Sequence, residues 1–282
     1  MSGVENVVDE GVNPGTAPGE LPGGLAVVIP AKDEAQRIAA TVQAAAGIVA
    51  GGVPVSLVVV VDDGSSDDTA ALAEAAGAVV VKHPKNKGKA GAMSSGAARV
   101  ASLDRSQKQP APRALLFLDA DLEGSAAAAA ALAEPVLKGE LDMSIATIPP
   151  QATSGGGRGR VVKLATKGIE RETGWTPKQP LSGNRCLTRK AFDAAKPLAP
   201  GWGVEVGLTI DLLHDGFRVG EVEADLHHRV TGTSKADQKH RADQYRDVWL
   251  ALLDRRVRKR ESRVVLVTVV AARIARSVLG RG

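Results

Sequence analysis

Short aliphatic runs alternate with alanine-rich stretches along the chain from Leu25 onward. The runs have the length and the Val, Ile and Leu content of buried strands, and they predict strands at 25–29, 56–61, 78–82, 114–118 and 142–147. The stretches between them favour helices at 34–49, 67–76, 91–102 and around the alanine run 126–131. Strands that alternate with helices are typical of βαβ units in a mostly parallel sheet. The pattern therefore predicts an α/β fold with helices flanking the sheet.

Two segments depart from this pattern. Residues 1–24 hold four acidic residues, no lysine or arginine, and many glycines and prolines, which predicts a disordered tail and not a signal peptide. Residues 151–160 combine glycines with two arginines, and we expect this segment to move and to close over a site. The length of 282 residues fits one large α/β domain or two small ones.

The C-terminal end is strongly basic. From residue 255 onward the chain has nine Lys or Arg and one acid, although the net charge of the whole chain is only +4. Such a segment could lie on an anionic membrane surface, or it could pack on the body as a solvated helix, and both interpretations stay open. The apolar stretch 264–272 is about half of the roughly 20 residues that span a bilayer, so we expect no transmembrane helix.

Composition narrows the class of protein further. The chain has only 3 Phe, 3 Trp and 1 Tyr, too few for stacking on nucleic-acid bases, so we expect no nucleic-acid partner. The single cysteine, Cys186, cannot form an intramolecular disulfide. This suits a reducing compartment, and we expect a cytoplasmic protein.

Acidic residues follow three of the predicted strands. They lie in Pro30-Ala-Lys-Asp-Glu34, in Asp62-Asp-Gly-Ser-Ser-Asp-Asp-Thr69 and in Asp119-Ala-Asp121-Leu-Glu123. Ligands of open α/β sheets bind beyond the carboxyl ends of the strands, where these carboxylates would meet and repel one another. The pattern indicates a site for a cation together with a polar ligand.

Among these acidic residues, the pair Asp119 and Asp121 indicates a metal site most specifically. Two carboxylates one residue apart at a strand end can both reach a hard divalent ion that also binds diphosphate oxygens. Glu123 could add a third oxygen, although exposed acids at an ordinary strand end would give the same pattern. Asn86-Lys-Gly-Lys89 precedes a predicted helix, so Lys87, Lys89 and backbone amides could meet phosphate.

Taken in order and spacing, these motifs resemble those of the family 2 (GT-A fold) glycosyltransferases. The resemblance implies a Rossmann-like fold that binds a nucleotide-diphospho-sugar, with UDP- or GDP-hexose as donor and Mg²⁺ or Mn²⁺ as cofactor. It places Asp119 and Asp121 on the metal, with Asp119 also close to the donor diphosphate. It places near the nucleoside of the donor the residues Pro30, Ala31, Glu34, Asp62 and Asp63, while Lys89 stays a candidate for the donor phosphates from its place before the helix. One departure is Asp33, where the family usually has Asn.

The second half is similar to the polyprenyl-phosphate (dolichyl-phosphate) mannosyl- and glucosyltransferase branch. The segments that carry this likeness are Pro180 to Phe192, Gly216 to Val222 and His228 to Lys235. The resemblance makes Arg185, Arg229 and Lys235 candidates to bind the acceptor phosphate or the donor diphosphate, and it puts Glu123 at the position of a third metal ligand.

A second likeness is to the glucosyl-3-phosphoglycerate synthases. It rests on Gly201-Trp-Gly-Val-Glu205 and implies His228 as a metal ligand. Glu205 could be a base, an acceptor of a sugar hydroxyl, or an acid that stabilises a helix N-terminus.

We therefore expect a metal-dependent hexosyltransferase, with Asp121, Glu205, Arg185 and Arg229 as catalytic residues. Residues 25–250 would form its GT-A domain, as a nucleotide and metal half (25–124) and an acceptor half (125–250), before a basic helix or tail at 251–282. The favoured acceptor is polyprenyl phosphate, with peripheral contact at the inner membrane face and a homodimer left open. The alternatives are a soluble phosphorylated acceptor, and a nucleotide-sugar-binding protein without catalysis.

Overall fold

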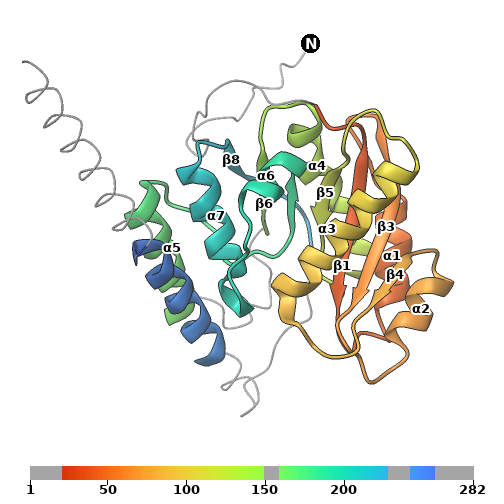
Figure 1. Cartoon of the computed structure of the whole chain (residues 1–282), viewed down its shortest axis with the longest axis horizontal. Coiled ribbons are helices and arrows are strands. Elements are labelled where there is room, and N and C mark those ends of the chain that lie inside the picture. The colour runs from red at the N-terminus through yellow and green to blue at the C-terminus, as the bar shows by residue number, and fades with distance from the viewer. Residues whose placement is uncertain (1–20, 149–158, 228–241, 258–282) are drawn as a thin grey trace, which may run out of the picture.

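The computed structural model describes residues 21–148, 159–227 and 242–257 (Figure 1). Its strands are β1 (Leu25–Ala31), β2 (Val49–Ala50), β3 (Val53–Asp62), β4 (Val79–Lys82), β5 (Ala114–Phe117), β6 (Met143–Thr147), β7 (Arg185–Leu187) and β8 (Val219–Glu223). Its α-helices are α1 (Ile38–Ala46), α2 (Thr69–Ala75), α3 (Gly88–Ser106), α4 (Ala130–Leu137), α5 (Arg160–Thr173), α6 (Arg189–Ala194) and α7 (Val204–His214). The 3₁₀ segments are η1 (Glu123–Ala129) and η2 (Gly201–Gly203), and the chain is helical again over 242–257.

The eight strands that the structure describes belong to one mixed sheet. The order is β2-β3-β1-β5-β7-β6-β8, and β4 also pairs with β3. The pairs β1–β3, β1–β5, β3–β4 and β6–β8 are parallel, whereas β7 runs antiparallel to both of its neighbours, β5 and β6. The α/β class with a flanked sheet is confirmed, and the sheet is mixed because of β7 and of the short antiparallel pair β2–β3.

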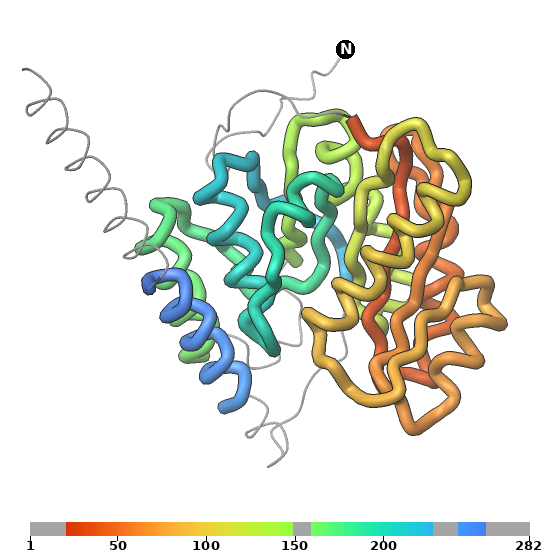
Figure 2. Tube along the Cα trace, in the orientation of Figure 1, coloured from red at the N-terminus to blue at the C-terminus, as the bar shows by residue number. Residues whose placement is uncertain are grey.

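Side chains alternate between two cores on the two faces of the sheet. In β1, Leu25, Val27 and Ile29 face one core, while Ala26 and Val28 face the other. This alternation is the period of two that a strand imposes on its side chains. Figure 2 shows α3, α6 and α7 on one face of the sheet, and they contribute to the second core together with α5 and the 242–257 helix.

The predicted elements are found with shifted ends. The helix expected from residue 34 begins at Ile38, because 34–37 form a turn in which the amides of Arg37 and Ile38 donate to the Glu34 carbonyl. The alanine run starts as 3₁₀ helix and becomes α-helical only at Ala130. Strand β7, three residues long, has too short a run for any periodicity to predict it.

The 242–257 helix crosses the predicted boundary between the domain and its basic tail at 250/251. Its residues Val248 and Leu252 belong to the second core, and Ala251 is also buried. Arg255 is buried and ion-paired with Asp211, while the Nε of Arg256 lies 3.0 Å from the Glu172 carboxylate. One helix thus continues across the predicted boundary, and the first two arginines of the basic segment bind the protein body.

Other sequence-based expectations fall mostly outside the described residues. This holds for 1–20, for 258–282, and for the segment 151–160 except Gly159 and Arg160, which open α5. Among the helices that the structure describes, none combines the length and the apolar character that crossing a membrane requires.

Gly96 provides a test of the packing between α3 and the sheet. A Cβ at this position would lie 2.3 Å from Val28 Cγ1 and 3.1 Å from Val61 Cγ2. We expect Gly96→Ala to lower the free energy of unfolding by about 1–2 kcal/mol, because overpacking outweighs the gain of roughly 1 kcal/mol in helix propensity. Gly124→Ala, at a position with open space around it, is the control. Urea unfolding measures the stability of both variants. Equal denaturation midpoints for Gly96→Ala and Gly124→Ala would contradict the close packing at Gly96.

Candidate active site

The carboxyl ends of β3, β1 and β5 lie at one edge of the sheet because these strands are parallel neighbours. Ala31 is paired with Asp62, and the Asp63 amide donates to the Ala31 carbonyl at 2.8 Å. The segments that follow the three strands are therefore adjacent. The predicted donor residues Pro30, Ala31, Asp62 and Asp63 lie at this edge together.

Hydrogen bonds join the segment after β1 to the segment after β3. The Asp33 carboxylate accepts from the backbone amide of Ser66 at 2.7 Å and from its hydroxyl at 3.0 Å. In return, the Asp33 amide donates to the Ser65 hydroxyl at 2.9 Å, and the Glu34 amide donates to the Thr69 hydroxyl at 2.8 Å. Asp33 has a φ of +55°, a backbone region that Asn and Asp tolerate better than other non-glycine residues. An aspartate can therefore occupy a position where the resembled family has asparagine.

Asp63 is buried and binds the loop before α3. Its carboxylate accepts from the amides of Lys87 and Gly88, both at 2.8 Å, and it lies 2.7 Å from His83 Nδ1. The other ring nitrogen of His83 contacts the Ser95 hydroxyl at 2.9 Å. The amides of Lys87 and Gly88, which the sequence suggested for phosphate, therefore bind the protein's own carboxylate.

Lys89 bridges two carboxylates from distant parts of the chain. Its Nζ lies 3.0 Å from Asp119 Oδ1, just after β5, and 2.9 Å from Glu205 Oε1, in the first turn of α7. Burial disfavours the charge on Lys89, but the two carboxylates outweigh burial and raise the pKa of Lys89. Lys89, Asp119 and Glu205, all candidates from the sequence, thus form one ion cluster.

The residues that orient Asp119 were not among the site residues predicted from the sequence. Asn184 is fully buried, accepts from the Asp119 amide at 2.9 Å, and donates to the Asp119 carboxylate at 3.3 Å. The neighbouring Gly183 leaves the room that the cluster needs, since a Cβ there would lie 2.2 Å from Lys89 Nζ. The signal available in the sequence was a Gly-Asn pair before a short buried strand, but the strand itself was not predicted.

Arg185 is a structural residue, in contrast to the phosphate-binding role expected from the sequence. It is 1% exposed, and its guanidinium donates to the carbonyls of Ser182, Pro180 and Glu205 and to the Thr209 hydroxyl. Burial lowers the pKa of Arg185 to about 10. The side chain ties the loop before β7 to α7 and offers no surface to a ligand.

Glu123 points to a neighbouring arginine. Its Oε1 lies 3.5 Å from Arg37 Nε, the side chain is 57% exposed, and its amide donates to the Thr41 hydroxyl. Arg37 also pairs with Glu34 at 3.4 Å, so it connects two of the strand-end segments. Arg37 and Thr41 lie on or next to α1, and no motif in the sequence singled them out.

A divalent ion fits the chemistry of Asp119 and Asp121. Mg²⁺ and similar ions need only one or two protein carboxylates when phosphate oxygens complete their coordination. Within the described part of the chain, no three His, Cys, Asp or Glu side chains group closely enough to hold a metal. Glu123 is therefore not brought into a three-carboxylate set. His228, Arg229 and Lys235 lie outside the described residues.

Comparisons with known proteins agree with this arrangement. A model of glycosyl transferase family 2 matches residues 26–195. A crystal structure of glucosyl-3-phosphoglycerate synthase from Mycobacterium tuberculosis with phosphoglyceric acid is 29% identical, with a TM-score of 0.61 over 82% of this chain and 79% of that chain. The same enzyme with Mn²⁺, UDP and phosphoglyceric acid is 28% identical, with a TM-score of 0.62 over 82% and 78%.

A third structure of that enzyme contains Mn²⁺, UDP-glucose and phosphoglyceric acid. It is 27% identical, with a TM-score of 0.60 over 82% of this chain and 79% of that chain. No protein with a curated description matches the sequence.

The ion cluster predicts that substitutions at Lys89 and Glu205 have coupled effects on the free energy of unfolding. Lys89→Met should lower the free energy of unfolding by about 3 kcal/mol, because it leaves the buried Glu205 carboxylate uncompensated. The double variant Lys89→Met/Glu205→Gln should recover at least half of that loss. Chemical denaturation of the unmodified protein, Lys89→Met, Glu205→Gln and the double variant measures the coupling. Losses that simply add would show that the two side chains do not interact.

Asp33 predicts a pH dependence. Its hydrogen bond with Lys32, followed by those with the Ser66 amide and hydroxyl, lowers the pKa of Asp33 to about 2. A lowered folded-state pKa means that the stabilisation is complete above the usual Asp value near 3.9 and is lost as the pH falls through about 2. NMR titration should show this pKa, and Ser66→Ala should raise it. An Asp33 that titrates near 4 in the unmodified protein would contradict the bonding.

Proposed function

The chain belongs to glycosyl transferase family 2, and on that premise we propose that it transfers a hexosyl group from a nucleoside-diphosphate sugar to a small phosphorylated hydroxy acid. The bond between the anomeric carbon and the diphosphate oxygen breaks, and its electron pair leaves with the nucleoside diphosphate. A hydroxyl oxygen of the acceptor forms the new bond to the anomeric carbon, and its proton passes to the departing nucleoside diphosphate.

One observation carries the choice of acceptor. The family match ends at residue 195 and so covers 170 of the 282 residues, about 60%. The likeness to glucosyl-3-phosphoglycerate synthase covers 82% of the chain, so it extends into the half where the acceptor is expected to bind. Structures of that enzyme contain UDP-glucose and phosphoglyceric acid. These similarities support UDP-glucose as donor and a phosphoglycerate-like acceptor.

The donor would bind at the carboxyl ends of β1, β3 and β5. We place the nucleoside beside Pro30, Ala31, Glu34 and Asp62, while Asp63 positions the loop that leads to Lys89. Asp119 and Asp121 would hold Mg²⁺ or Mn²⁺, which when bound supplies neutralisation of the charge on the leaving diphosphate. Asn184 holds the Asp119 carboxylate in orientation through its two hydrogen bonds.

Glu205 lies where it can serve the donor sugar. Its carboxylate is held by Lys89 at 2.9 Å and lies at the N-terminal turn of α7, where the helix dipole favours a negative charge. We assign to it the acceptance of a hydrogen bond from a sugar hydroxyl. His228 as a further metal ligand, and Arg229 on the acceptor phosphate, remain proposals from the sequence.

The identity of the acceptor distinguishes the proposed function from transfer to polyprenyl phosphate. Purified protein is incubated with Mn²⁺ and labelled UDP- or GDP-hexoses, with 3-phosphoglycerate or a short polyprenyl phosphate as acceptor. We expect label in a new water-soluble phosphorylated glycoside that requires 3-phosphoglycerate. Label in the organic phase would overturn the proposed acceptor and support the polyprenyl phosphate favoured from the sequence. Donor binding without transfer to either acceptor would favour a non-catalytic protein.

Asp121→Asn tests the role of the strand-end carboxylates. The substitution keeps the shape and removes the charge, and we expect kcat to fall at least 100-fold because charge stabilisation of the leaving group is lost. Asp215→Asn, at an exposed aspartate just after α7, is the matched control and should keep full activity. Full activity of Asp121→Asn across added Mn²⁺ concentrations would exclude this role.

A further inference from the structure

Exposed apolar side chains concentrate on the 242–257 helix. The part of the chain that the structure describes has eight exposed large apolar residues, and five of them are on this helix, between 40% and 48% exposed. They are Tyr245, Trp249, Leu250, Leu253 and Val257. Single exposed apolar residues are ordinary, but a cluster of this size marks an interaction surface.

Helical spacing makes these residues one stripe. Four of them, at 245, 249, 253 and 257, follow one another at intervals of four, which places them on one side of the helix. The buried residues of the helix, Val248, Ala251 and Leu252, lie on a different side. We call the five exposed residues the apolar stripe. The helix is thus apolar on its core side and also along this stripe.

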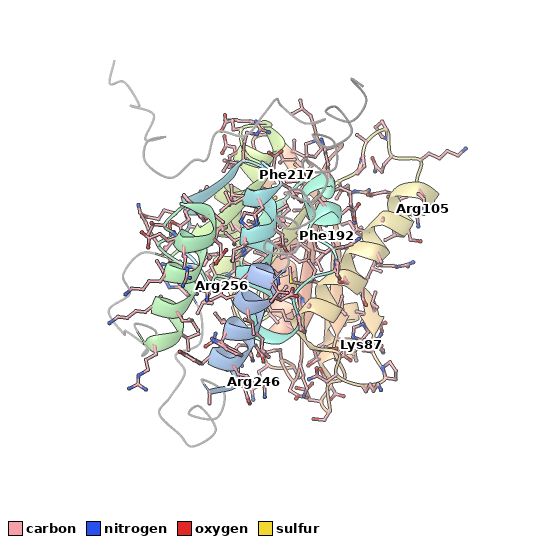
Figure 3. All side chains as sticks on the ribbon, turned by 60° about the vertical axis from the view of Figure 1, so that its left-hand side comes forward. Lys87, Arg105, Phe192, Phe217, Arg246 and Arg256 are labelled. Carbon is pink, nitrogen blue, oxygen red and sulfur yellow. The ribbon has the colours of Figure 1, made fainter. Side chains whose placement is uncertain are left out.

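A basic row lies on the neighbouring helix, α5. Arg160, Lys163, Lys167 and Arg171 are exposed on its outer side, opposite the buried residues Ala165 and Ile169, and Glu170 is the exposed acid among the residues of α5. The two helices touch: a Cβ on Gly168 would meet Leu252 Cδ1 at 2.5 Å, and Arg256 pairs with Glu172. Figure 3 shows them side by side at one end of the molecule.

We propose that the face made by the apolar stripe and the basic row docks onto the surface of an anionic phospholipid bilayer. Tyr and Trp favour the membrane–water interface, where an apolar ring and a polar group are both satisfied. Apolar residues beside lysines and arginines are the pattern by which helices lie on anionic membranes. The proposal does not depend on the acceptor, because no residue of the apolar stripe or the basic row belongs to the cluster of Lys89, Asp119 and Glu205.

Electrostatic complementarity favours an anionic membrane over a second copy of the chain or residues 258–282 as the group that covers the apolar stripe. A second copy of the chain would bring a second basic row to the same contact. The chain beyond the structure, 258–282, would bring seven Lys or Arg and one acid. An anionic lipid surface complements the row, and each Lys or Arg near it adds to the attraction. Asp243 and Asp254 reduce this attraction on the helix itself without reversing the positive sign of the face.

Vesicle binding by the full-length protein tests the proposal. We expect co-sedimentation with vesicles of phosphatidylcholine and phosphatidylglycerol, weak binding to pure phosphatidylcholine, and release at 1 M salt. Trp249→Ser/Leu253→Ser and Lys163→Glu/Lys167→Glu should each reduce the partition coefficient at least tenfold. Both pairs are exposed, so the variants should fold. Leu72→Ser/Lys190→Glu, two exposed residues on α2 and α6, is the control and should bind like the unmodified protein.

Three results would overturn the proposal. One is the absence of binding to anionic vesicles by the unmodified protein. Another is binding that the stripe and row variants leave unchanged. The third is a dimer in light scattering that Trp249→Ser/Leu253→Ser converts to monomer, since the stripe would then be covered by a second copy. Transfer activity is assayed in solution with the same variants, so a failure of the proposed function is distinguished from a failure of docking.

Discussion

A single ammonium group connects the two halves of the protein. Lys89, at the start of α3, meets Asp119 at the end of β5 and Glu205 at the start of α7. Two carboxylates at one partly buried place require a cation, and the position of that cation then constrains all three elements. Gly183 and Asn184 follow from the same requirement, one by leaving space and the other by fixing the Asp119 carboxylate. The antiparallel strand β7 places both residues, because it begins directly after them.

Much of the polar edge of the sheet is occupied by the protein's own hydrogen bonds. Asp63 accepts from the amides of Lys87 and Gly88, and Arg185 donates to carbonyls of the loop before β7. Such bonds fix the backbone before any ligand arrives, so less conformational freedom is lost on binding. Charged residues in a nucleotide-sugar enzyme are therefore divided between those that meet substrates and those that hold the loops. Their identity alone does not tell the two groups apart.

Patterns within a few residues predicted the sheet, the helices of the first half and the acidic strand ends. Aliphatic runs define buried strands, and parallel neighbours bring their ends together, so Asp62, Asp63 and Asp119 could be expected at one edge. The rest depends on contacts across long separations. Asn184 and Asp119 are 65 residues apart, and Arg37 meets Glu123 across the sheet edge. The role of Arg185 could not be predicted, because only the fold determines whether a guanidinium meets phosphate or carbonyls.

The contact between α5 and the 242–257 helix also constrains how the sequence can vary. Gly168 has no side chain, and the space beside it is filled by Leu252 from a segment more than eighty residues later. A larger residue at position 168 would be accommodated only by a smaller one at position 252. The two positions should therefore covary among relatives that keep this helix pair, with the summed side-chain volume conserved. Such covariation would identify the helix pair even in relatives that have neither glycine at position 168 nor leucine at position 252.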